Sequence, residues 1–273
     1  MKVIAGIVLY NPQKERLMEN INAISSQVES VFCIDNASDN KYEIGQIISR
    51  YSNVSVKYNS ENKGIAAALN QLLKYAMDNN ATYLLTLDQD SVVSDKYVHD
   101  ILDFYISDNV ALIGPNILDR NDKSGVMLEN KNIRCVNDCI TSGTMMNVQI
   151  CKKIGWFDEK MFIDYVDFEY CYRVVDKGYK IIKNNNVVLS HQLGDGKIVR
   201  LLGKNIMVAN HSPIRHFYLI RNLVYLVKKY PMRTVIFMRR IFKEFILIIF
   251  YELNKREKLK ACIKGMYKGL FMR

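Results

Sequence analysis

The chain has 273 residues, of which 49% are hydrophobic, enough to bury the core of one large domain or of a domain with an appendage. Its six cysteines form no C-x-x-C pair, which argues against a zinc or dithiol redox motif and favours reduced thiols in the cytoplasm. The apolar run after Met1 has strand length and no small-residue cleavage site follows it, so a secretory signal is not expected.

The formal net charge of +10 is concentrated at one end of the sequence. Thirteen Lys and Arg residues but only three Asp and Glu residues lie from Lys228 to Arg273, so this segment carries the whole excess. A basic segment attracts anionic surfaces, so a nucleic acid or a membrane is the partner to consider for the tail. The first 227 residues need a separate explanation.

The first hundred residues alternate short apolar runs with segments of helical spacing, a pattern typical of parallel strands joined by crossover helices. Asn11 and Pro12 are expected to begin the first helix as its cap and its first residue. Strands are predicted at 2–10, 30–35, 54–59, 82–87 and 110–114, and helices after Pro12 and at 41–51, 64–77 and 95–106.

Beyond Pro115 the alternation weakens. Short strands are expected near 126–136 and 140–148, with a helix from about Asp164 to Lys177. After about residue 205 the sequence changes to long aromatic and aliphatic helical segments, broken at Pro231. We therefore predict an α/β domain at 1–205, with a mostly parallel sheet flanked by helices, and a helical extension at 206–273.

Polar residues follow four successive predicted strands. In an open parallel sheet, ligands bind outside the carboxyl ends of the strands, so these residues are candidates for holding a polar ligand. They are Tyr10, Asn11, Asp35, Asn36, Asn59, Asp88, Gln89 and Asp90.

Asp88 and Asp90 flank one glutamine at the end of an apolar run. Where a strand ends and the backbone turns, two such carboxylates can approach one cation, and Mg²⁺ or Mn²⁺ commonly binds one or two carboxylates together with phosphate oxygens. The pair therefore indicates a site for a metal and a diphosphate. The alternative is that Asp90 caps the next loop while Asp88 is solvated.

Two further segments extend this candidate site. Asp35 and Asn36 can accept hydrogen bonds from a base or a ribose, although an Asx turn would use the same residues. Asn59, Lys63 and Gly64 precede a helix start, where free N–H groups and a lysine attract an anion, although a plain helix-start loop looks similar.

Taken together, the motifs resemble glycosyltransferase family 2, whose fold is known as GT-A, and within it the rhamnosyltransferases of bacterial surface polysaccharides. The matching segments lie in family order between residues 3 and 222. They are "GIVLYNP", "FCIDNASDN", "NSENKGIAAALNQ", "LLTLDQDSVV", "TSGTMMNV", "GWFDEKMFIDYVDFEYCYR" and "SPIRHFYLIRN".

The resemblance implies roles for the acidic residues. Asp35 would bind the nucleotide base or ribose, Asp90 would hold Mg²⁺ or Mn²⁺ on the donor diphosphate, and Asp88 would assist the metal or the donor sugar. Asp167 would be the general base of a single displacement that inverts the anomeric carbon. Relatives often carry a Glu-Asp pair where this chain has Val166 and Asp167, so a share of the work for Asp164 stays open, as does ordinary helix capping.

Other residues follow from the same resemblance. His191 is a candidate metal ligand, with a structural histidine as the alternative. Trp156, Phe157 and Asp158 are candidates for the acceptor site, with Trp156 as a simple core residue as the alternative. The pattern P-x-R-x-x-Y-x-x-R-N includes Arg215, Arg221 and Asn222, whose role does not follow from the sequence.

The basic tail completes the hypothesis. Residues 234–251 are nearly long enough to span a bilayer, but charges interrupt them, so an amphipathic helix on an anionic membrane is expected, with a helix pair packed on the catalytic domain as the alternative. We predict transfer of rhamnose from dTDP-rhamnose to a lipid-linked saccharide at the inner face of the cell membrane. The alternatives are another donor, such as UDP-galactose or UDP-N-acetylglucosamine, and a nucleic-acid-binding protein, which lacks a recognised motif here.

Overall fold

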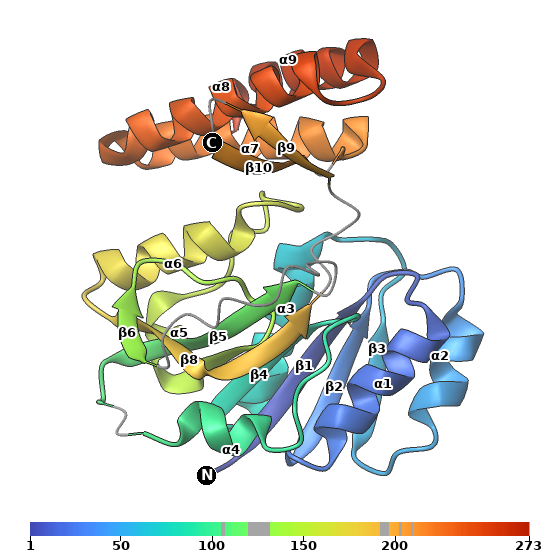
Figure 1. Ribbon diagram of the computed structural model, residues 1–273. Coiled ribbons are helices and arrows are strands. Elements are labelled where there is room, and N and C mark those ends of the chain that lie inside the picture. The colour runs from blue at the N-terminus through green and yellow to red at the C-terminus, as the bar shows by residue number, and fades with distance from the viewer. Residues whose placement is uncertain (105–106, 120–131, 192–196, 202–203, 209, 273) are drawn as a thin grey trace. The chain divides into compact units, whose positions relative to one another are not determined.

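The computed structural model describes residues 1–104, 107–119, 132–191, 197–201, 204–208 and 210–272 (Figure 1). Internal contacts divide the chain into two compact units. The sheet unit comprises Met1–Glu159 and Asp167–Gln192, and the helical unit comprises Lys160–Val166 and Leu193–Arg273. The boundary predicted from the sequence, after residue 205, falls within the range Leu193–Arg273 of the helical unit.

The sheet unit is built on a mixed sheet of eight described strands in the order β3-β2-β1-β4-β7-β5-β8-β6. Its first half, β3 (Val54–Tyr58), β2 (Ser30–Asp35), β1 (Val3–Leu9) and β4 (Tyr83–Asp88), is parallel throughout. This half confirms the alternation of strands and helices predicted from the sequence.

The second half of the sheet mixes directions. β7 (Thr144–Asn147) runs antiparallel to both β4 and β5 (Val110–Asp119), whereas β8 (Lys180–His191) is parallel to β5. β6 (Ile133–Val136) is the antiparallel edge strand beside β8. Of the two short strands predicted here, β7 lies within 140–148 and β6 within 126–136, where residues 126–131 lie outside the described part.

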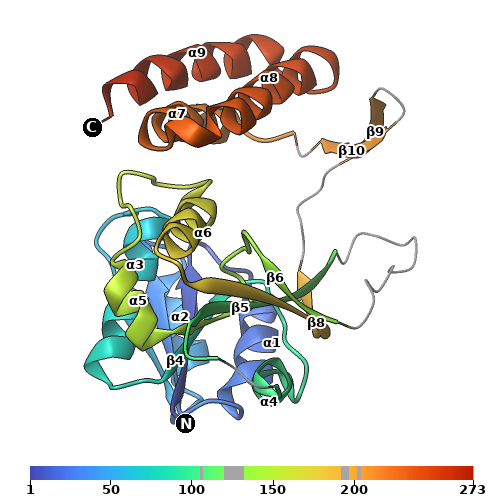
Figure 2. The same cartoon turned by 90° about the vertical axis from the view of Figure 1, so that its left-hand side faces the viewer.

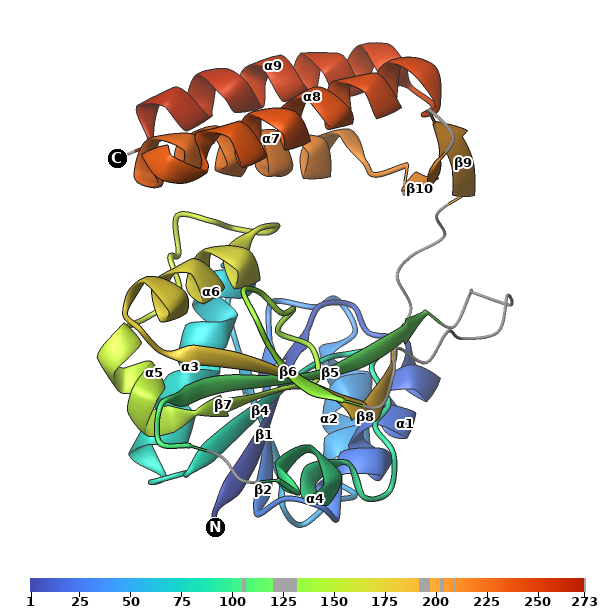
Figure 3. The same ribbon diagram turned by 60° about the vertical axis from the view of Figure 1, so that its left-hand side comes forward.

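Helices cover both faces of the sheet (Figure 3). One face carries α1 (Lys14–Ser25), α2 (Lys41–Ile48) and α4 (Tyr97–Leu102), and the other carries α3 (Ile65–Asp78), α5 (Val148–Ile154) and α6 (Val166–Asp176). Side chains alternate along β1, so Ala5, Ile7 and Leu9 join the core beneath α1 and α2. Gly6 faces α3, and a Cβ there would lie 2.8 Å from Leu72 Cδ1, so this glycine permits the close approach of α3.

The first helix begins later than its sequence signal predicts. α1 starts at Lys14 with Gln13 at the cap position. Asn11 instead has a left-handed main chain (φ 48°), and its Oδ1 accepts a hydrogen bond from the main-chain N–H of Asp39. The expected cap therefore links the loop after β1 to the loop after β2.

The helical unit contains an antiparallel pair, β9 (Lys197–Leu201) and β10 (Lys204–Val208), followed by three long helices. α7 (Pro213–Lys229), α8 (Thr234–Phe250) and α9 (Lys255–Phe271) lie side by side (Figure 2), with a 3₁₀ turn at Pro231–Arg233 where the break was predicted. Gly265 and Gly269 bring α9 against α7, since a Cβ at either position would lie 2.5 Å from a carbonyl oxygen of α7. Over the described part of the chain, no helix is both long and apolar enough to cross a bilayer.

Candidate active site

The carboxyl ends of the four parallel strands meet at one edge of the sheet. The register pairs Leu9 with Asp35, Asp35 with Tyr58, and Val8 with Asp88. The polar residues that follow each strand are therefore neighbours at this edge, which we call the donor rim. It consists of Tyr10, Asn11, Asp35, Asn36, Asn59, Lys63, Gly64, Asp88, Gln89 and Asp90.

Asn36 joins the end of β2 to the loop between β3 and α3. Its Oδ1 accepts hydrogen bonds from Asn59 Nδ2 at 3.1 Å and from the main-chain N–H of Lys63 at 3.0 Å. Its Nδ2 donates to Gly64 O at 3.2 Å and to Asn62 Oδ1 at 2.9 Å. Asn36 is buried and both polar atoms of its amide form hydrogen bonds, so these contacts position the loop that leads into α3.

Gly64 has a conformation that suits few other residues, with φ 83° and ψ 169°. It precedes Ile65, the first residue of α3, whose first turn contains no acidic side chain. The exposed Lys63 lies beside this helix start. A helix N-terminus beside a lysine favours an anion, which fits a donor diphosphate.

Asp35 is fully buried, and its carboxylate accepts hydrogen bonds from the main-chain N–H of Ser38 at 3.2 and 3.3 Å. The turn that these bonds close includes Ala37, which has φ 68°. The local turn that the sequence left open as an alternative is thus present. Direct binding of a base or ribose by Asp35 stays a prediction.

Gln89 lies between the two carboxylates and binds the end of β1. Its Oε1 accepts from the Tyr10 N–H at 2.8 Å, and its Nε2 donates to Tyr10 O at 3.2 Å. Asp88 and Asp90, on either side of it, are both partly exposed. The middle residue of the D-Q-D triplet therefore fixes the turn after β4, while both carboxylates keep access to solvent.

Two residues that the sequence analysis missed support the same turn. Asn20, on α1, is fully buried and its Nδ2 donates to the main-chain oxygen of Asp88 at 2.7 Å. Ser142 Oγ accepts from the Asp88 N–H at 3.1 Å and lies 2.7 Å from Ser91 Oγ. The sequence carries a signal for Asn20, because it interrupts the apolar stripe of Leu17, Ile21 and Ile24, whereas Ser142 has no local signal.

The donor rim fits a divalent cation that arrives with a diphosphate. Mg²⁺ and Mn²⁺ take oxygen ligands, and such sites commonly use one or two carboxylates completed by phosphate oxygens and water. The partly exposed Asp88 and Asp90 supply that donor set. Within the described residues, no group of three or more His, Cys, Asp and Glu side chains forms a complete protein cage for a metal.

The second acidic cluster surrounds the start of α6. Asp167 lies in the first turn, and its Oδ1 accepts a hydrogen bond from the Phe168 N–H at 2.9 Å. Glu169 is fully buried and forms a bidentate ion pair with Arg173, whose Nε and Nη2 both lie 2.9 Å from carboxylate oxygens. Val166, where the family resemblance of the sequence leads us to expect a glutamate, is also buried. Asp167 is thus the partly exposed carboxylate of this turn.

Asp164 has a different environment. Its carboxylate pairs with Arg215 of α7, with Nε and Nη2 3.2 and 3.1 Å from Oδ1. Both Asp164 and the next residue, Tyr165, have left-handed main chains, with φ values of 67° and 63°. A guanidinium already occupies the oxygens of Asp164. The role of Asp167 as the base, with or without a share for Asp164, stays a prediction.

The predicted acceptor residues are placed differently from one another. Trp156 is 49% exposed and lines an open groove of about 630 Å³ together with Tyr58, Asn59, Lys63 and Glu159. Phe157 is buried and stacks on Tyr170 at 4.2 Å, while its main-chain N–H donates to Asn70. The groove therefore brings Trp156, but not the Phe157 ring, next to residues of the donor rim, and Asp158 is partly exposed beside them in sequence.

His191 is the last residue of β8, opposite Asp119 of β5. Its side chain lies outside the described residues, so its predicted metal contact stays a prediction.

Comparison with known proteins agrees with this arrangement. The family model for glycosyl transferase family 2 matches residues 5–168, more than half of the chain. The dTDP-rhamnosyl transferase RfbF of Shigella flexneri is 27% identical over 288 residues, which cover 98% of this chain and 95% of that protein.

Two solved structures share the fold. S. aureus TarS 1–349 in complex with UDP-GlcNAc superposes with a TM-score of 0.62 at 16% identity, covering 97% of this chain and 82% of that chain. The mannosyltransferase PcManGT from Pyrobaculum calidifontis, in complex with GDP-Man and Mn²⁺, gives a TM-score of 0.61 at 13% identity, covering 98% and 75%. The fold is therefore GT-A, as predicted. The chain belongs to glycosyl transferase family 2, as a glycosyltransferase with the fold of enzymes that use nucleotide-sugar donors.

Proposed function

We propose that this chain is a metal-dependent inverting glycosyltransferase that transfers L-rhamnose from dTDP-rhamnose to a lipid-linked saccharide in cell-surface polysaccharide synthesis. The observation that carries the reaction is the donor rim, where four parallel strands end in polar groups and Asp88 and Asp90 stay accessible. The choice of donor is supported by the similarity to a dTDP-rhamnosyl transferase over nearly the full length of both chains.

In this proposal the donor lies along the rim. Asn36 and Asn59 shape the loop that receives the nucleotide, and Lys63 with the N-terminus of α3 attracts the diphosphate. Asp90, assisted by Asp88, would hold Mg²⁺ or Mn²⁺. That cation would offset the negative charge that grows on the leaving diphosphate.

Asp167 is the base that activates the acceptor. Its carboxylate takes the proton of an acceptor hydroxyl while the hydroxyl oxygen forms a bond to the anomeric carbon and the bond to the diphosphate oxygen breaks. The products are an inverted glycoside and dTDP. Trp156 presents an exposed aromatic face in the groove beside Asn59 and Lys63, and such a face suits a sugar ring.

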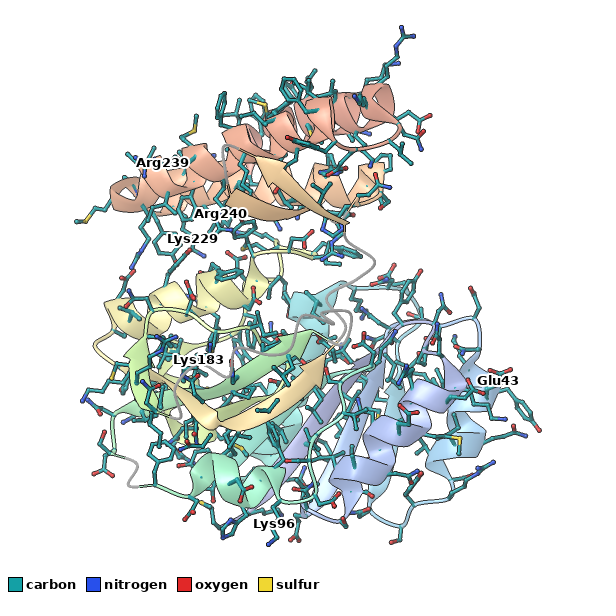
Figure 4. The ribbon with its side chains drawn as sticks, in the orientation of Figure 1. Glu43, Lys96, Lys183, Lys229, Arg239 and Arg240 are labelled. Carbon is teal, nitrogen blue, oxygen red and sulfur yellow. The ribbon has the colours of Figure 1, made fainter. Side chains whose placement is uncertain are left out.

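The helical unit offers a surface for the membrane that would carry such an acceptor. α8 and α9 expose large apolar side chains together with many cations, and Figure 4 labels Arg239 and Arg240 of α8 and Lys229 of α7. Aromatic and aliphatic groups can enter the headgroup region while basic groups meet anionic lipid phosphates. The exposed large apolar residues of α8, α9 and the turn between them are Val235, Ile236, Met238, Phe242, Ile249, Phe250, Leu253, Ile263, Met266, Tyr267, Leu270 and Phe271.

The test is release of nucleoside diphosphate from a panel of nucleotide sugars. The enzyme is incubated with Mn²⁺ or Mg²⁺, a lipid-linked saccharide fraction, and dTDP-rhamnose, UDP-galactose or UDP-N-acetylglucosamine. We expect acceptor-dependent release of dTDP from dTDP-rhamnose and a product of inverted anomeric configuration by NMR. Preferred turnover of a UDP-sugar would reject the donor, and retention of configuration would reject the single displacement.

A further inference from the structure

The sequence pattern P-x-R-x-x-Y-x-x-R-N gains a role from its contacts. Its members lie on α7 at spacings of three and four residues, so Arg215, Tyr218 and Asn222 share one face of the helix. Each contacts the segment Lys160–Asp164, which leads into α6 and belongs to the same helical unit. We call this segment the base-leading loop.

Four residues of α7 hold the base-leading loop. Asn222 Nδ2 donates to Ile163 O and to Asp164 O, both at 2.8 Å, and Arg215 pairs with the Asp164 carboxylate. Phe162 stacks on Tyr218 at 4.8 Å. The guanidinium of Arg221 donates to Lys160 O at 2.7 Å.

The α7 residues that make these contacts also interact with one another. Arg221 donates from Nε and Nη2 to Asn222 Oδ1, which turns the amide so that its Nδ2 faces the loop. The Arg221 guanidinium lies 4.7 Å from the centre of the Tyr218 ring, the same ring that stacks on Phe162. Asn222 is fully buried, and both Oδ1 and Nδ2 of its amide form hydrogen bonds.

The main chain is strained at the end of the base-leading loop. Asp164 and Tyr165 are consecutive non-glycine residues with left-handed main chains, a state that costs about 1–2 kcal/mol for each residue. Such strain persists only where surrounding contacts determine it. The bonds from Asn222 and Arg215 fall on Ile163 and Asp164, four and three residues before Asp167.

We propose that Arg215 and Asn222 are positioning residues, which set the place of the Asp167 carboxylate by holding the turn at Ile163–Tyr165. This inference rests on the proposed role of Asp167 as the base. Asp164 then serves as the ion-pair partner of Arg215 rather than as a second base. Since only Tyr165 and Val166 separate the base-leading loop from Asp167, a change in the turn moves the start of α6.

The variants are Arg215→Ala, Arg215→Lys, Asp164→Asn and the double variant Arg215→Ala/Asp164→Asn. We expect kcat of Arg215→Ala to fall about 100-fold, the usual result of a misplacement near 1 Å, while the KM for the donor stays within about twofold. Arg215→Lys keeps the charge but loses the planar fork, so partial recovery of about 10-fold is expected. Arg256→Ala, an exposed arginine of α9 in the same unit, is the control and should match the wild type.

The double variant tests whether Arg215 acts through Asp164. If Arg215 acts through Asp164, the double variant is no slower than the slower single variant, because both changes remove the same link. Independent losses that multiply would overturn the proposal, and so would an unchanged kcat in Arg215→Ala.

A second pair of variants covers the case in which Arg215→Ala fails to fold. Asn222→Asp keeps the acceptor for Arg221 but removes the donor to Ile163 O and Asp164 O, so it should lower kcat as well. Asn222→Asp with wild-type kcat and a wild-type circular dichroism spectrum would also reject the proposal. Failure of the proposed function differs from both results, because the wild type itself would then transfer no sugar.

Discussion

Asn20 of α1 donates a hydrogen bond from Nδ2 to the main-chain oxygen of Asp88, at a distance of 2.7 Å. Asn20 is fully buried, and its Oδ1 has no hydrogen-bond partner among the described residues. Burying the unpaired Oδ1 costs the free energy of its desolvation, so the hydrogen bond from Nδ2 to Asp88 is the contact that this buried amide supplies. A buried side chain of α1 thus fixes the main chain of Asp88, the first acidic residue of the D-Q-D triplet.

Asn20→Leu should weaken the metal site without touching a ligand. The variant loses the bond to Asp88 O, and loss of a group that orients a metal ligand typically costs about 10–100-fold in metal affinity or activity. We expect the Mn²⁺ concentration for half-maximal activity to rise by about 10-fold. Asn22→Leu, on the exposed side of the same helix, is the control, and an Asn20→Leu enzyme with the metal dependence of that control would contradict the role.

Asp167→Asn tests the base. The amide has nearly the same shape but cannot accept the proton, so kcat should fall about 100–10,000-fold, the usual contribution of a general base. Binding of dTDP, followed by calorimetry, should stay at the wild-type level. An Asp167→Asn enzyme that turns over normally would show that another group removes the proton.

Glu244 makes the stability of the helical unit depend on pH. Burial, and next the nearby Glu252 carboxylate, raise the pKa of Glu244 from 4.5 to about 7, with Asp164 adding to this shift and Lys243 and Arg240 opposing it. The folded chain therefore binds this proton more tightly than the unfolded chain. Its contribution to the free energy of unfolding is present below pH 4.5 and is lost as pH rises toward about 7.

Glu244→Gln should remove this dependence. The variant is expected to match the wild type near pH 4.5 and to be the more stable protein above pH 7, measured by denaturant unfolding at each pH. His211 titrates in the opposite sense, since burial and Arg215 lower its pKa to about 4, but it is present in both proteins and cancels in the difference. Glu257→Gln, at an exposed site of α9, is the control. A stability difference between Glu244→Gln and the wild type that is the same at all pH values would refute the assignment.

The exposed aromatic residues of α8 should bind lipid. Phe242→Glu/Phe250→Glu replaces two exposed rings with carboxylates, which oppose both entry into the headgroup region and attraction to anionic lipid. We expect the wild type to sediment with phosphatidylglycerol-containing vesicles and the variant to stay in the supernatant. Tyr42→Glu, which removes a ring from α2 that is at least as exposed as the two phenylalanines, should sediment like the wild type. Equal sedimentation of all three proteins would exclude this surface, and binding to nucleic acid instead would support the competing role of the tail.

The parallel half of the fold was predictable because its signals are local. Apolar runs of strand length alternate with helical spacing from Val3 to Asp88, and the polar residues at the strand ends follow directly from that order. The metal and donor candidates therefore came from the sequence with no knowledge of long-range contacts. The register of the strands then brings Asp35 and Asp88 to the same edge.

The remainder depends on contacts between distant residues. Asp164 and Arg215 are separated by 51 positions, so no spacing in the sequence indicates their ion pair. Ser142 meets Asp88 only because β7 inserts beside β4 in the antiparallel direction. The start of α1 differed from its prediction for the same reason, since the amide of Asn11 bonds Asp39 of another loop instead of capping the helix.

The most direct test of the donor rim is calorimetric titration of dTDP with and without Mn²⁺, using the wild type, Asp90→Asn and Asp95→Asn. Asp95 is exposed and lies five residues beyond Asp90, so its variant controls for a lost charge near the same loop. We predict that Mn²⁺ tightens dTDP binding by at least about 10-fold in the wild type and Asp95→Asn and has no effect in Asp90→Asn. Equal tightening in Asp90→Asn would contradict it, because the cation would then bind elsewhere.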